Sequence, residues 1–303
     1  MRSYRYLHYD VFTDRAFAGN QLAVYLDGRG LSTDTMQAIA KEMNFSETTF
    51  LLPPESKATD VRMRIFTPGS ELPMAGHPTI GSSFALARCG VIEPGRERFV
   101  FGLGVGPVAV SLNWKGGDLH FAWMTQLEPT FGEPLADPAH AARALSLSAA
   151  AVTGTSKPVQ IVSCGVPFLF VPLATRRAVD SAVLNVAEYR ALLTSISAKA
   201  NGVFLFSAER GPERATVYSR LFAPDLGIAE DPATGSASGP LGCYLVRHKI
   251  VKHDKARSIV SLQGVKMGRP SQIHVSIGMD GGDISSVQVG GESVLAGEGT
   301  LYV

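Results

Sequence analysis

The stretch RIFTPGSELPMAGHPTIGSSFALA, which runs from Arg64 to Ala87, decides the fold because most of it occurs twice. The second version is RLFAPDLGIAEDPATGSASGPLGCYL, from Arg220 to Leu245. The two openings, Arg-Ile-Phe-Thr-Pro and Arg-Leu-Phe-Ala-Pro, align at an offset of 156 residues. Further on, the pairs His77-Pro78 and Asp231-Pro232 align at an offset of 154. A repeat of this length predicts two copies of one fold unit that are related by approximate symmetry.

Each copy carries the local signals of a strand, a loop and then a helix. The strand ends at a proline, and after the loop a His-Pro or Asp-Pro pair begins a run of small and apolar residues. Proline is tolerated at the first helical position, and aspartate is a favoured cap. We therefore predict helices over Pro78–Arg88 and Ala233–Arg247, capped by His77 and Asp231. A helix start carries free N–H groups and a partial positive charge, so the two starts are predicted to bind one small anion between them.

Length and composition fit a protein with two packed domains. The chain has 303 residues, of which 45% are hydrophobic and 18% are charged, a balance that supports packed cores. The Pro- and acid-rich segment Glu128–Pro138 is the predicted linker. We therefore place the first domain at residues 1–127 and the second at 128–291.

Charge and hydropathy exclude two classes of partner. The net charge is +1 with no basic block, so neither nucleic acid nor an acidic membrane surface is an expected partner. No apolar stretch approaches the roughly 18 residues of a membrane span, and the start lacks the apolar core of a signal peptide. A cytoplasmic location is predicted.

Mixed strands with one apolar helix in each half predict an α+β fold. Tyr4–Phe12, Gln21–Leu26 and Val61–Phe66 are among the expected strands, and Thr35–Met43 is an expected helix behind the capping segment Ser32–Asp34. The expected architecture is two similar domains, each a central helix wrapped by a curved β-sheet, in a pseudo-twofold duplication.

Three titratable side chains are candidates for proton transfer. Glu47 lies among apolar and hydroxyl residues at a helix-to-strand junction, where burial would raise its pKa and suit a proton shuttle. The alternative is an exposed glutamate at the start of a strand. His77 and Asp231 are ordinary caps when each is taken alone, but their matching places in the repeat favour a shared, partly dry cleft.

Other candidates are polar groups near the same segments. Ser236 lies in the first turns of its helix, where its N–H and hydroxyl can meet a substrate or only pack. Asn20 is a turn residue that can also touch a ligand. The chain has no complete dinucleotide fingerprint, no phosphate-binding loop and no histidines at ligand spacing, so neither a cofactor nor a metal is predicted.

Four segments resemble the PhzF-like phenazine-biosynthesis isomerase family, within the diaminopimelate-epimerase-like fold: DVFTDRAFAGNQLAV, NFSETTFLLP, RIFTPGSELPMAGHPT and RLFAPDLGIAEDPATGSASGPL. They are spread from Asp10 to Leu241 and are specific when taken together. The resemblance implies two barrel-like domains, a substrate cleft between them and a homodimer. It also implies that the last strand, residues 292–303, returns to the first domain. Gln21 departs from the pattern, because the family usually has proline there.

The resemblance also assigns roles to residues. The family's reaction moves a proton from C3 to C1 of trans-2,3-dihydro-3-hydroxyanthranilate without a cofactor, and Glu47 matches the glutamate that takes and returns this proton. His77, Asp231 and Ser236 match the other polar groups of the site. The expected contacts with the small carboxylate substrate are Asn20, Gly76, Thr234 and Gly235.

Two other functions stay open. The first is epimerisation or racemisation of an amino or hydroxy acid. The epimerase relatives use a pair of cysteines at the helix starts, but here Cys89 and Cys243 lie 12 residues beyond His77 and Asp231. That spacing is about 18 Å along a helix, which disfavours a two-thiol mechanism. The second is a non-catalytic protein that binds small anions.

Overall fold

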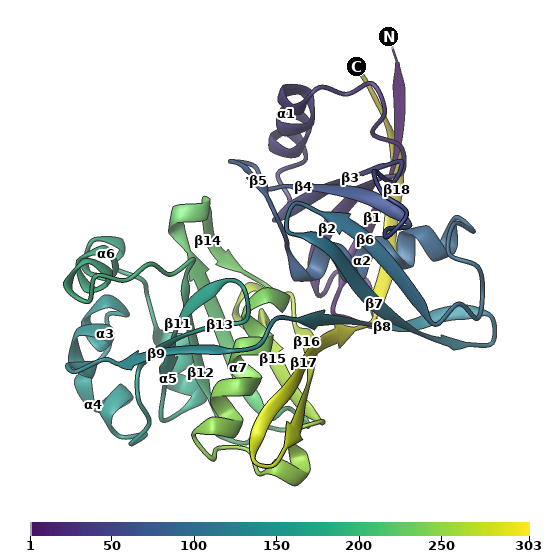
Figure 1. Cartoon of the computed structure of the whole chain (residues 1–303). Helices are drawn as coiled ribbons and strands as arrows, with labels where there is room; N and C mark the ends of the chain where they lie inside the picture. Colours follow the sequence, from purple (N-terminus) through teal and green to yellow (C-terminus); the bar gives the residue numbers. More distant parts are fainter. Residues whose placement is uncertain (1) are drawn as a thin grey trace. The chain divides into compact units, whose positions relative to one another are not determined.

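The computed structural model describes residues 2–303, which divide into two compact units (Figure 1). Unit 1 comprises the described residues up to Thr125 together with Val289–Val303, and unit 2 comprises Gln126–Gln288. The predicted linker Glu128–Pro138 is wrong, because it contains strand β9 (Thr130–Pro134) of unit 2, which pairs with β10 (Gln160–Ser163). Proline is tolerated in an edge strand, so the Pro-rich composition did not mark a linker.

Unit 1 is a set of strands around one buried helix, α2 (Gly76–Arg88). The strands are hydrogen-bonded in the order β18–β1–β2–β3–β4–β6–β7–β8, and β5 adds to β4. The other elements of this unit are β1 (Ser3–Val11), β2 (Asn20–Tyr25), α1 (Thr33–Met43), β3 (Glu47–Leu52), β4 (Val61–Phe66), β5 (Glu71–Leu72), β6 (Arg98–Leu103), β7 (Gly106–Lys115), β8 (Asp118–Gln126) and β18 (Ser293–Tyr302).

Unit 2 likewise surrounds one buried helix, α7 (Gly235–Arg247). Its strands are paired in the order β9–β10–β11–β12–β13–β15–β16, and β14 adds to β13. The other elements are α3 (Pro138–Ala144), α4 (Ala149–Thr153), β11 (Pro167–Pro172), α5 (Arg176–Ser181), α6 (Val186–Ser195), β12 (Val203–Ser207), β13 (Val217–Ala223), β14 (Ile228–Asp231), β15 (Ile259–Gln263), β16 (Ser271–Asp280), β17 (Asp283–Gly291) and the 3-10 turns Pro224–Leu226, His253–Lys255 and Val265–Met267.

The pairing pattern confirms the duplication predicted from the sequence. In unit 1 the pairs β2–β3, β3–β4, β4–β6 and β6–β7 alternate between parallel and antiparallel. In unit 2 the pairs β11–β12, β12–β13, β13–β15 and β15–β16 alternate in the same way. Each unit thus repeats one α+β arrangement around its own helix.

Both central helices are packed closely by strands, and small residues make this possible. A Cβ atom at Gly81 of α2 would lie 2.6 Å from side-chain carbons of both Val11 and Leu22. At Gly242 of α7 it would lie 2.6 Å from Val275. These distances are shorter than real Cβ contacts, so any larger residue at these places would push a strand off the helix.

The repeat also conserves an arginine that lies over a phenylalanine two residues later. Arg64 binds Glu71 through two hydrogen bonds and lies 5.1 Å from the Phe66 ring centroid. Arg220 likewise binds Glu230 through two hydrogen bonds, each 2.8 Å long, and lies close to the ring of Phe222. The arginine therefore links the long strand to the short one in each unit, β4 to β5 in unit 1 and β13 to β14 in unit 2.

This match corrects the alignment of the two copies. Since Glu71 corresponds to Glu230, the offset at this point is 159 residues, so the segment ELPMAGH corresponds to EDPATGS. The strand registers agree, because Ile65 pairs with Leu72 and Leu221 pairs with Asp231. The predicted equivalence of His77 and Asp231 is therefore wrong.

The helix starts explain the error. Helix α2 begins at Gly76 with Ala75 as its N-cap, and α7 begins at Gly235 with Thr234 as its N-cap. His77 is thus inside the first turn of α2, whereas Asp231 ends strand β14 and lies before the helix. Proline fits both a first helical turn and a loop, so the shared His-Pro and Asp-Pro pairs did not identify equivalent positions.

The two ends of unit 1 are paired in one sheet. Strand β18 runs antiparallel to β1 from Ser293 opposite Val11 to Tyr302 opposite Ser3, and the two strands lie side by side in Figure 1.

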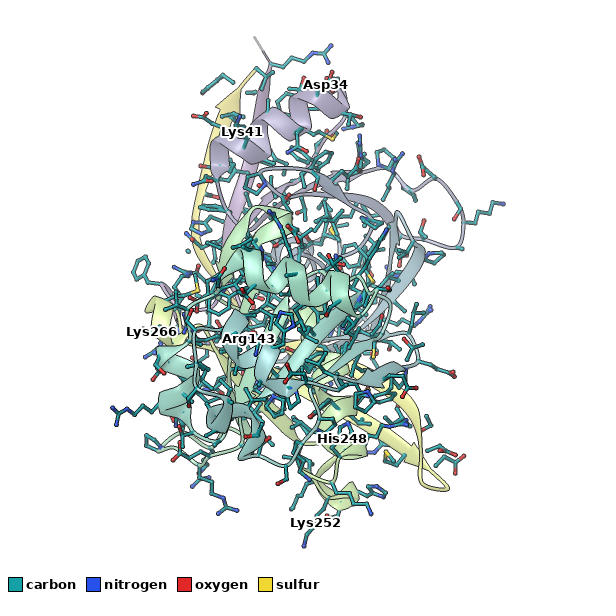
Figure 2. The ribbon with its side chains drawn as sticks, turned by 90° about the vertical axis from the view of Figure 1, so that its left-hand side faces the viewer. Asp34, Lys41, Arg143, His248, Lys252 and Lys266 are labelled. Atoms are coloured by element: carbon teal, nitrogen blue, oxygen red, sulfur yellow. The ribbon has the colours of Figure 1, made fainter. Side chains whose placement is uncertain are left out.

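Helix α1 covers this unit with Ser32 as its N-cap, as predicted. Its acidic Asp34 and basic Lys41 lie at opposite ends (Figure 2), which suits the helix dipole. Within residues 2–303 no helix combines the length and apolarity needed to cross a membrane.

Candidate functional site

In unit 1, three of the predicted site residues come together at the start of α2. Asn20 begins β2 and Glu47 begins β3, and these parallel strands place Leu22 opposite Glu47. His77 follows Gly76 in the first turn of α2. The Asn20 amide nitrogen lies 3.3 Å from His77 Nδ1, and Glu47 Oε2 lies 3.1 Å from the same nitrogen. All three residues are buried, so the alternative of an exposed strand-start Glu47 is wrong.

The hydrogen bonds of His77 define its tautomer. Its Nε2 lies 3.3 Å from the Gln21 carbonyl oxygen, an acceptor, so Nε2 carries the hydrogen. Burial lowers the pKa of His77 to about 3, while the bond to Gln21 opposes this shift. The imidazole is therefore neutral near pH 7, and its Nδ1 is a hydrogen-bond acceptor.

The same reasoning places a proton between His77 and Glu47. Nδ1 of a neutral Nε2–H imidazole and an ionised carboxylate are both acceptors, and they would not attract each other at 3.1 Å. A single proton on Glu47 that is donated to Nδ1 makes the contact favourable. The pair can therefore release this proton to a ligand and take one back, which is what a combined general acid and base requires.

We expect His77 to stay neutral and as the Nε2–H tautomer between pH 5 and 9, because its pKa in the folded protein is about 3. In the unfolded chain its pKa is about 6.5. Stability from this group is therefore complete above pH 6.5 and is lost as the pH falls toward 3. Imidazole ¹H–¹⁵N spectra check the tautomer, and a His77→Gln variant should lose part of the acid sensitivity. A His77 signal that titrates near pH 6.5 would contradict the assignment.

In unit 2, the predicted residues cluster at the start of α7. The Thr234 hydroxyl donates a short hydrogen bond to Asp231 Oδ2. Both residues are buried, and Gly235 and Ser236 follow as the first two residues of the helix. Ser236 is half-buried. Neither α7 nor α2 has a side chain capping its N-terminus, so each helix start presents backbone N–H groups beside a carboxyl side chain.

Two glutamines complete this second cluster, and the sequence reasoning missed both. Gln263, at the end of β15, bonds both Asp231 and Thr234. Gln126, the first residue of unit 2, donates to the Gly235 carbonyl oxygen at 3.0 Å. Both come from strands remote in sequence from the repeated segment, so no local motif indicated them. Comparison of the two copies in the corrected alignment is the signal that finds Gln263.

The cysteines do not take part in either cluster. Cys243 is buried within α7, and its sulfur lies 3.9 Å from that of buried Cys164. The hydrogen bond from Cys164, followed by burial, raises the pKa of the Cys243 thiol. Cys89 is exposed at the C-terminal end of α2, opposite to His77. Among residues 2–303, no group of three or more His, Cys, Asp or Glu side chains could hold a metal ion.

Native protein is expected to react with a thiol reagent at Cys89 alone, because the other two thiols are buried. Thiol titration before and after unfolding, with mass spectrometry to locate the label, measures this. Labelling of Cys89 should leave turnover unchanged. Inactivation by the label in wild type, but not in a Cys89→Ser variant, would instead favour a thiol-dependent mechanism.

Comparison with known proteins gives one consistent result. The family described as phenazine biosynthesis-like protein matches residues 9–299. An uncharacterised isomerase of Mesorhizobium japonicum is 36% identical over 307 residues, covering both chains fully. The trans-2,3-dihydro-3-hydroxyanthranilate isomerase of Pseudomonas aeruginosa is 35% identical over 300 residues, 99% of this chain and 100% of that one.

Solved structures agree with these relatives. A phenazine biosynthesis protein of the PhzF family from Bacillus anthracis superposes with a TM-score of 0.89 at 26% identity, over 100% of both chains. A probable proline racemase from Agrobacterium radiobacter superposes with a TM-score of 0.69 at 11% identity, over 99% of this chain and 93% of that one. The second likeness shows a shared fold only.

Proposed function

We propose that this chain, which belongs to the phenazine biosynthesis-like family, is an isomerase of PhzF type that moves a proton on a small cyclic carboxylate. Its curated relatives in this family are named isomerases. The proposed substrate is trans-2,3-dihydro-3-hydroxyanthranilate or a close analogue. The observation that carries the proposal is the contact of buried Glu47 with neutral His77, at 3.1 Å.

In the proposed mechanism Glu47 passes its own proton to His77 Nδ1, and the resulting carboxylate takes a proton from one ring carbon and returns it to another. The neutral pair and the carboxylate–imidazolium pair carry the same net charge, so this exchange adds no net charge to the buried site. The N–H groups at the starts of α2 and α7 suit a substrate carboxylate. We propose that Asp231 and Ser236 act on the same substrate molecule as Glu47.

The buried thiols argue against the epimerase alternative. Two-base racemisation through cysteines needs a thiolate at one helix start and a thiol at the other, but the residues there are His77 and Ser236. Cys243 is held protonated inside the core, and Cys89 lies at the other end of its helix.

The test is incubation with trans-2,3-dihydro-3-hydroxyanthranilate in heavy water, followed by NMR and absorbance. We expect isomerisation, with deuterium appearing on the ring at the carbon that receives the proton. Deuterium at the α-carbon of an amino or hydroxy acid in a substrate panel would favour an epimerase instead. Tight carboxylate binding without exchange in any ligand would favour a binding protein, and either result would overturn the proposal.

A further inference from the structure

We propose that Gln263 is a positioning residue that orients the Asp231 carboxylate through the Thr234 hydroxyl. The inference rests on the proposed function, in which Asp231 contacts the substrate. Gln263 itself is completely buried at the end of β15, so it acts on the reaction only through these neighbours.

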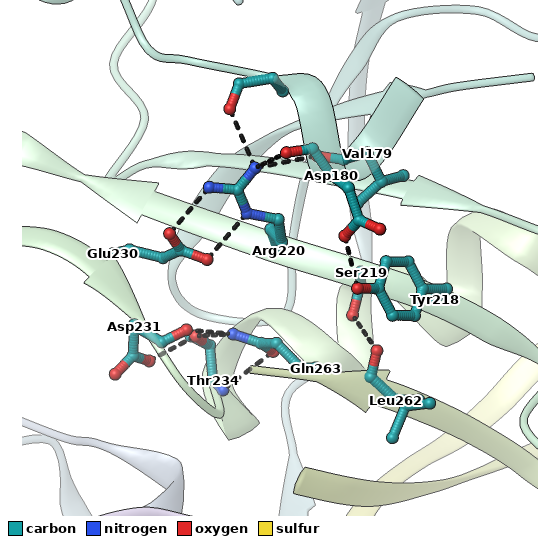
Figure 3. Close-up of polar contacts among 11 residues, drawn as sticks. Val179, Asp180, Tyr218, Ser219, Arg220, Glu230, Asp231, Thr234, Leu262 and Gln263 are labelled. Atoms are coloured by element: carbon teal, nitrogen blue, oxygen red, sulfur yellow. Dashed lines mark hydrogen bonds and ion pairs between the residues drawn. The ribbon is translucent and has the colours of Figure 1, made fainter. Parts of the chain in front are cut away.

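The side-chain amide of Gln263 makes three hydrogen bonds to the segment that carries Asp231 (Figure 3). Its Nε2 donates to the Asp231 carbonyl oxygen at 2.8 Å and to Thr234 Oγ1 at 3.0 Å. Its Oε1 accepts the Thr234 backbone N–H at 3.1 Å. Both ends of the amide are therefore used to hold one four-residue turn.

These bonds impose a direction on the Thr234 hydroxyl. The Gln263 amide nitrogen can only donate, so Thr234 Oγ1 must accept from it, and the single hydroxyl hydrogen is left for Asp231 Oδ2. The result is a one-way chain of hydrogen bonds from Gln263 through Thr234 to Asp231. Because the chain is buried, its geometry is held without competition from water.

The first copy of the repeat shows the same segment without this series of hydrogen bonds. The positions of Asp231, Thr234 and Gln263 are occupied in unit 1 by an apolar set: Leu72, Ala75 and Leu103. The strand registers support this match, because Arg62 pairs with Gly102 in one unit and Tyr218 pairs with Leu262 in the other. All three positions are polar in one copy and apolar in the other, so we infer that the three polar residues act as one unit.

The backbone around the three positions is alike in both copies. A Cβ atom at Gly264 would lie 2.5 Å from the Pro232 carbonyl oxygen, and one at Gly104 would lie 2.9 Å from Pro73 Cα. Both glycines thus let the end of the strand approach the proline of the turn. Since unit 1 builds this frame with apolar side chains, folding alone does not require Gln263, and its polarity is explained by the orientation of Asp231.

The test replaces the polar residues by those of the other copy and measures kcat and KM separately. Gln263→Leu and Thr234→Ala should each lower kcat by about 10- to 100-fold, the usual cost of a misplaced reacting group, with a smaller change in KM. Thr234→Ser keeps the hydroxyl and should restore most of the kcat that Thr234→Ala loses. The double variant Gln263→Leu/Thr234→Ala should be little worse than either single one, because both break the same chain.

The matched control is Gln160→Leu. Gln160 is a second buried glutamine of unit 2 that bonds Gly132 and His248, away from this turn. If Gln263→Leu lowers kcat no more than Gln160→Leu does, or if the two single effects multiply in the double variant, the proposal is wrong.

A crystal structure of Gln263→Leu separates this inference from the proposed function. We expect the Asp231 carboxylate to leave its position against Thr234, whether or not any substrate is turned over. An unchanged Asp231 side chain would overturn the positioning role. A displaced Asp231 in a protein whose wild type turns over no substrate would keep the positioning role and overturn only the proposed reaction.

Discussion

Replacing Glu47 by glutamine is expected to lower turnover by about 10²- to 10⁴-fold, the usual contribution of a general acid–base group. The amide of the new side chain can donate to His77 Nδ1, where Oε2 now lies 3.1 Å away, so the imidazole stays neutral and the pocket keeps its shape. Binding of a substrate analogue and the thermal midpoint should therefore change little. Steady-state kinetics, calorimetric binding and thermal unfolding measure the three quantities.

The control is Glu42→Gln, which changes the same group on the exposed side of α1. This variant should match wild type in all three measurements. Near-normal turnover in Glu47→Gln would remove Glu47 from the mechanism. Loss of folding in that variant would show that the carboxyl group is needed for structure instead.

The second large effect concerns stability, and Arg220→Met is expected to cost about 3–5 kcal/mol in the free energy of unfolding. Arg220 is buried, binds Glu230 through two hydrogen bonds and donates to the carbonyl oxygens of Val179, Asp180 and Ala182 (Figure 3). Methionine would fill the space but leave Glu230 and these carbonyls without their donor. Urea unfolding monitored by circular dichroism gives the free energy.

The repeat supplies the matched control for this variant, since Arg64 makes the same bidentate pair with Glu71 in unit 1. The side chain of Glu71 is 38% exposed, against 17% for Glu230, so water can replace the lost donor. Arg64→Met should therefore cost about 1 kcal/mol or less. Equal losses in the two variants would show that burial of the pair does not set its energetic importance.

The duplication was predictable because strand and helix patterns occur twice, and the residue pattern Arg-x-Phe keeps the same contacts in both copies. The alignment of the two copies within the repeat could not be predicted in the same way. The 3-10 turn Pro224–Leu226 and a longer loop are present only in the second copy. Matching His77 to Asp231 by their following prolines ignored Gly76 and Gly235, the residues that begin both helices.

The candidate residues were found with uneven success. Glu47 and His77 carry signals in their own neighbourhoods, a polar group in an apolar junction and a histidine before a helical run. Gln263 carries none, because an isolated glutamine in an apolar strand looks the same whether it packs or positions a carboxylate. Its partners are set by the parallel pairing of β13 with β15, a long-range feature that short sequence windows do not contain.

The pairing of β1 with β18 has a consequence for biosynthesis. On the ribosome, β18 emerges only after every residue of unit 2. Unit 2 is continuous in sequence and can complete its hydrogen bonding during translation, whereas the nascent first unit must wait with the outer edge of β1 open. An uncovered strand edge of this kind can pair with other chains. Slow translation of the region between β1 and β18 therefore prolongs the time during which the newly made protein can aggregate.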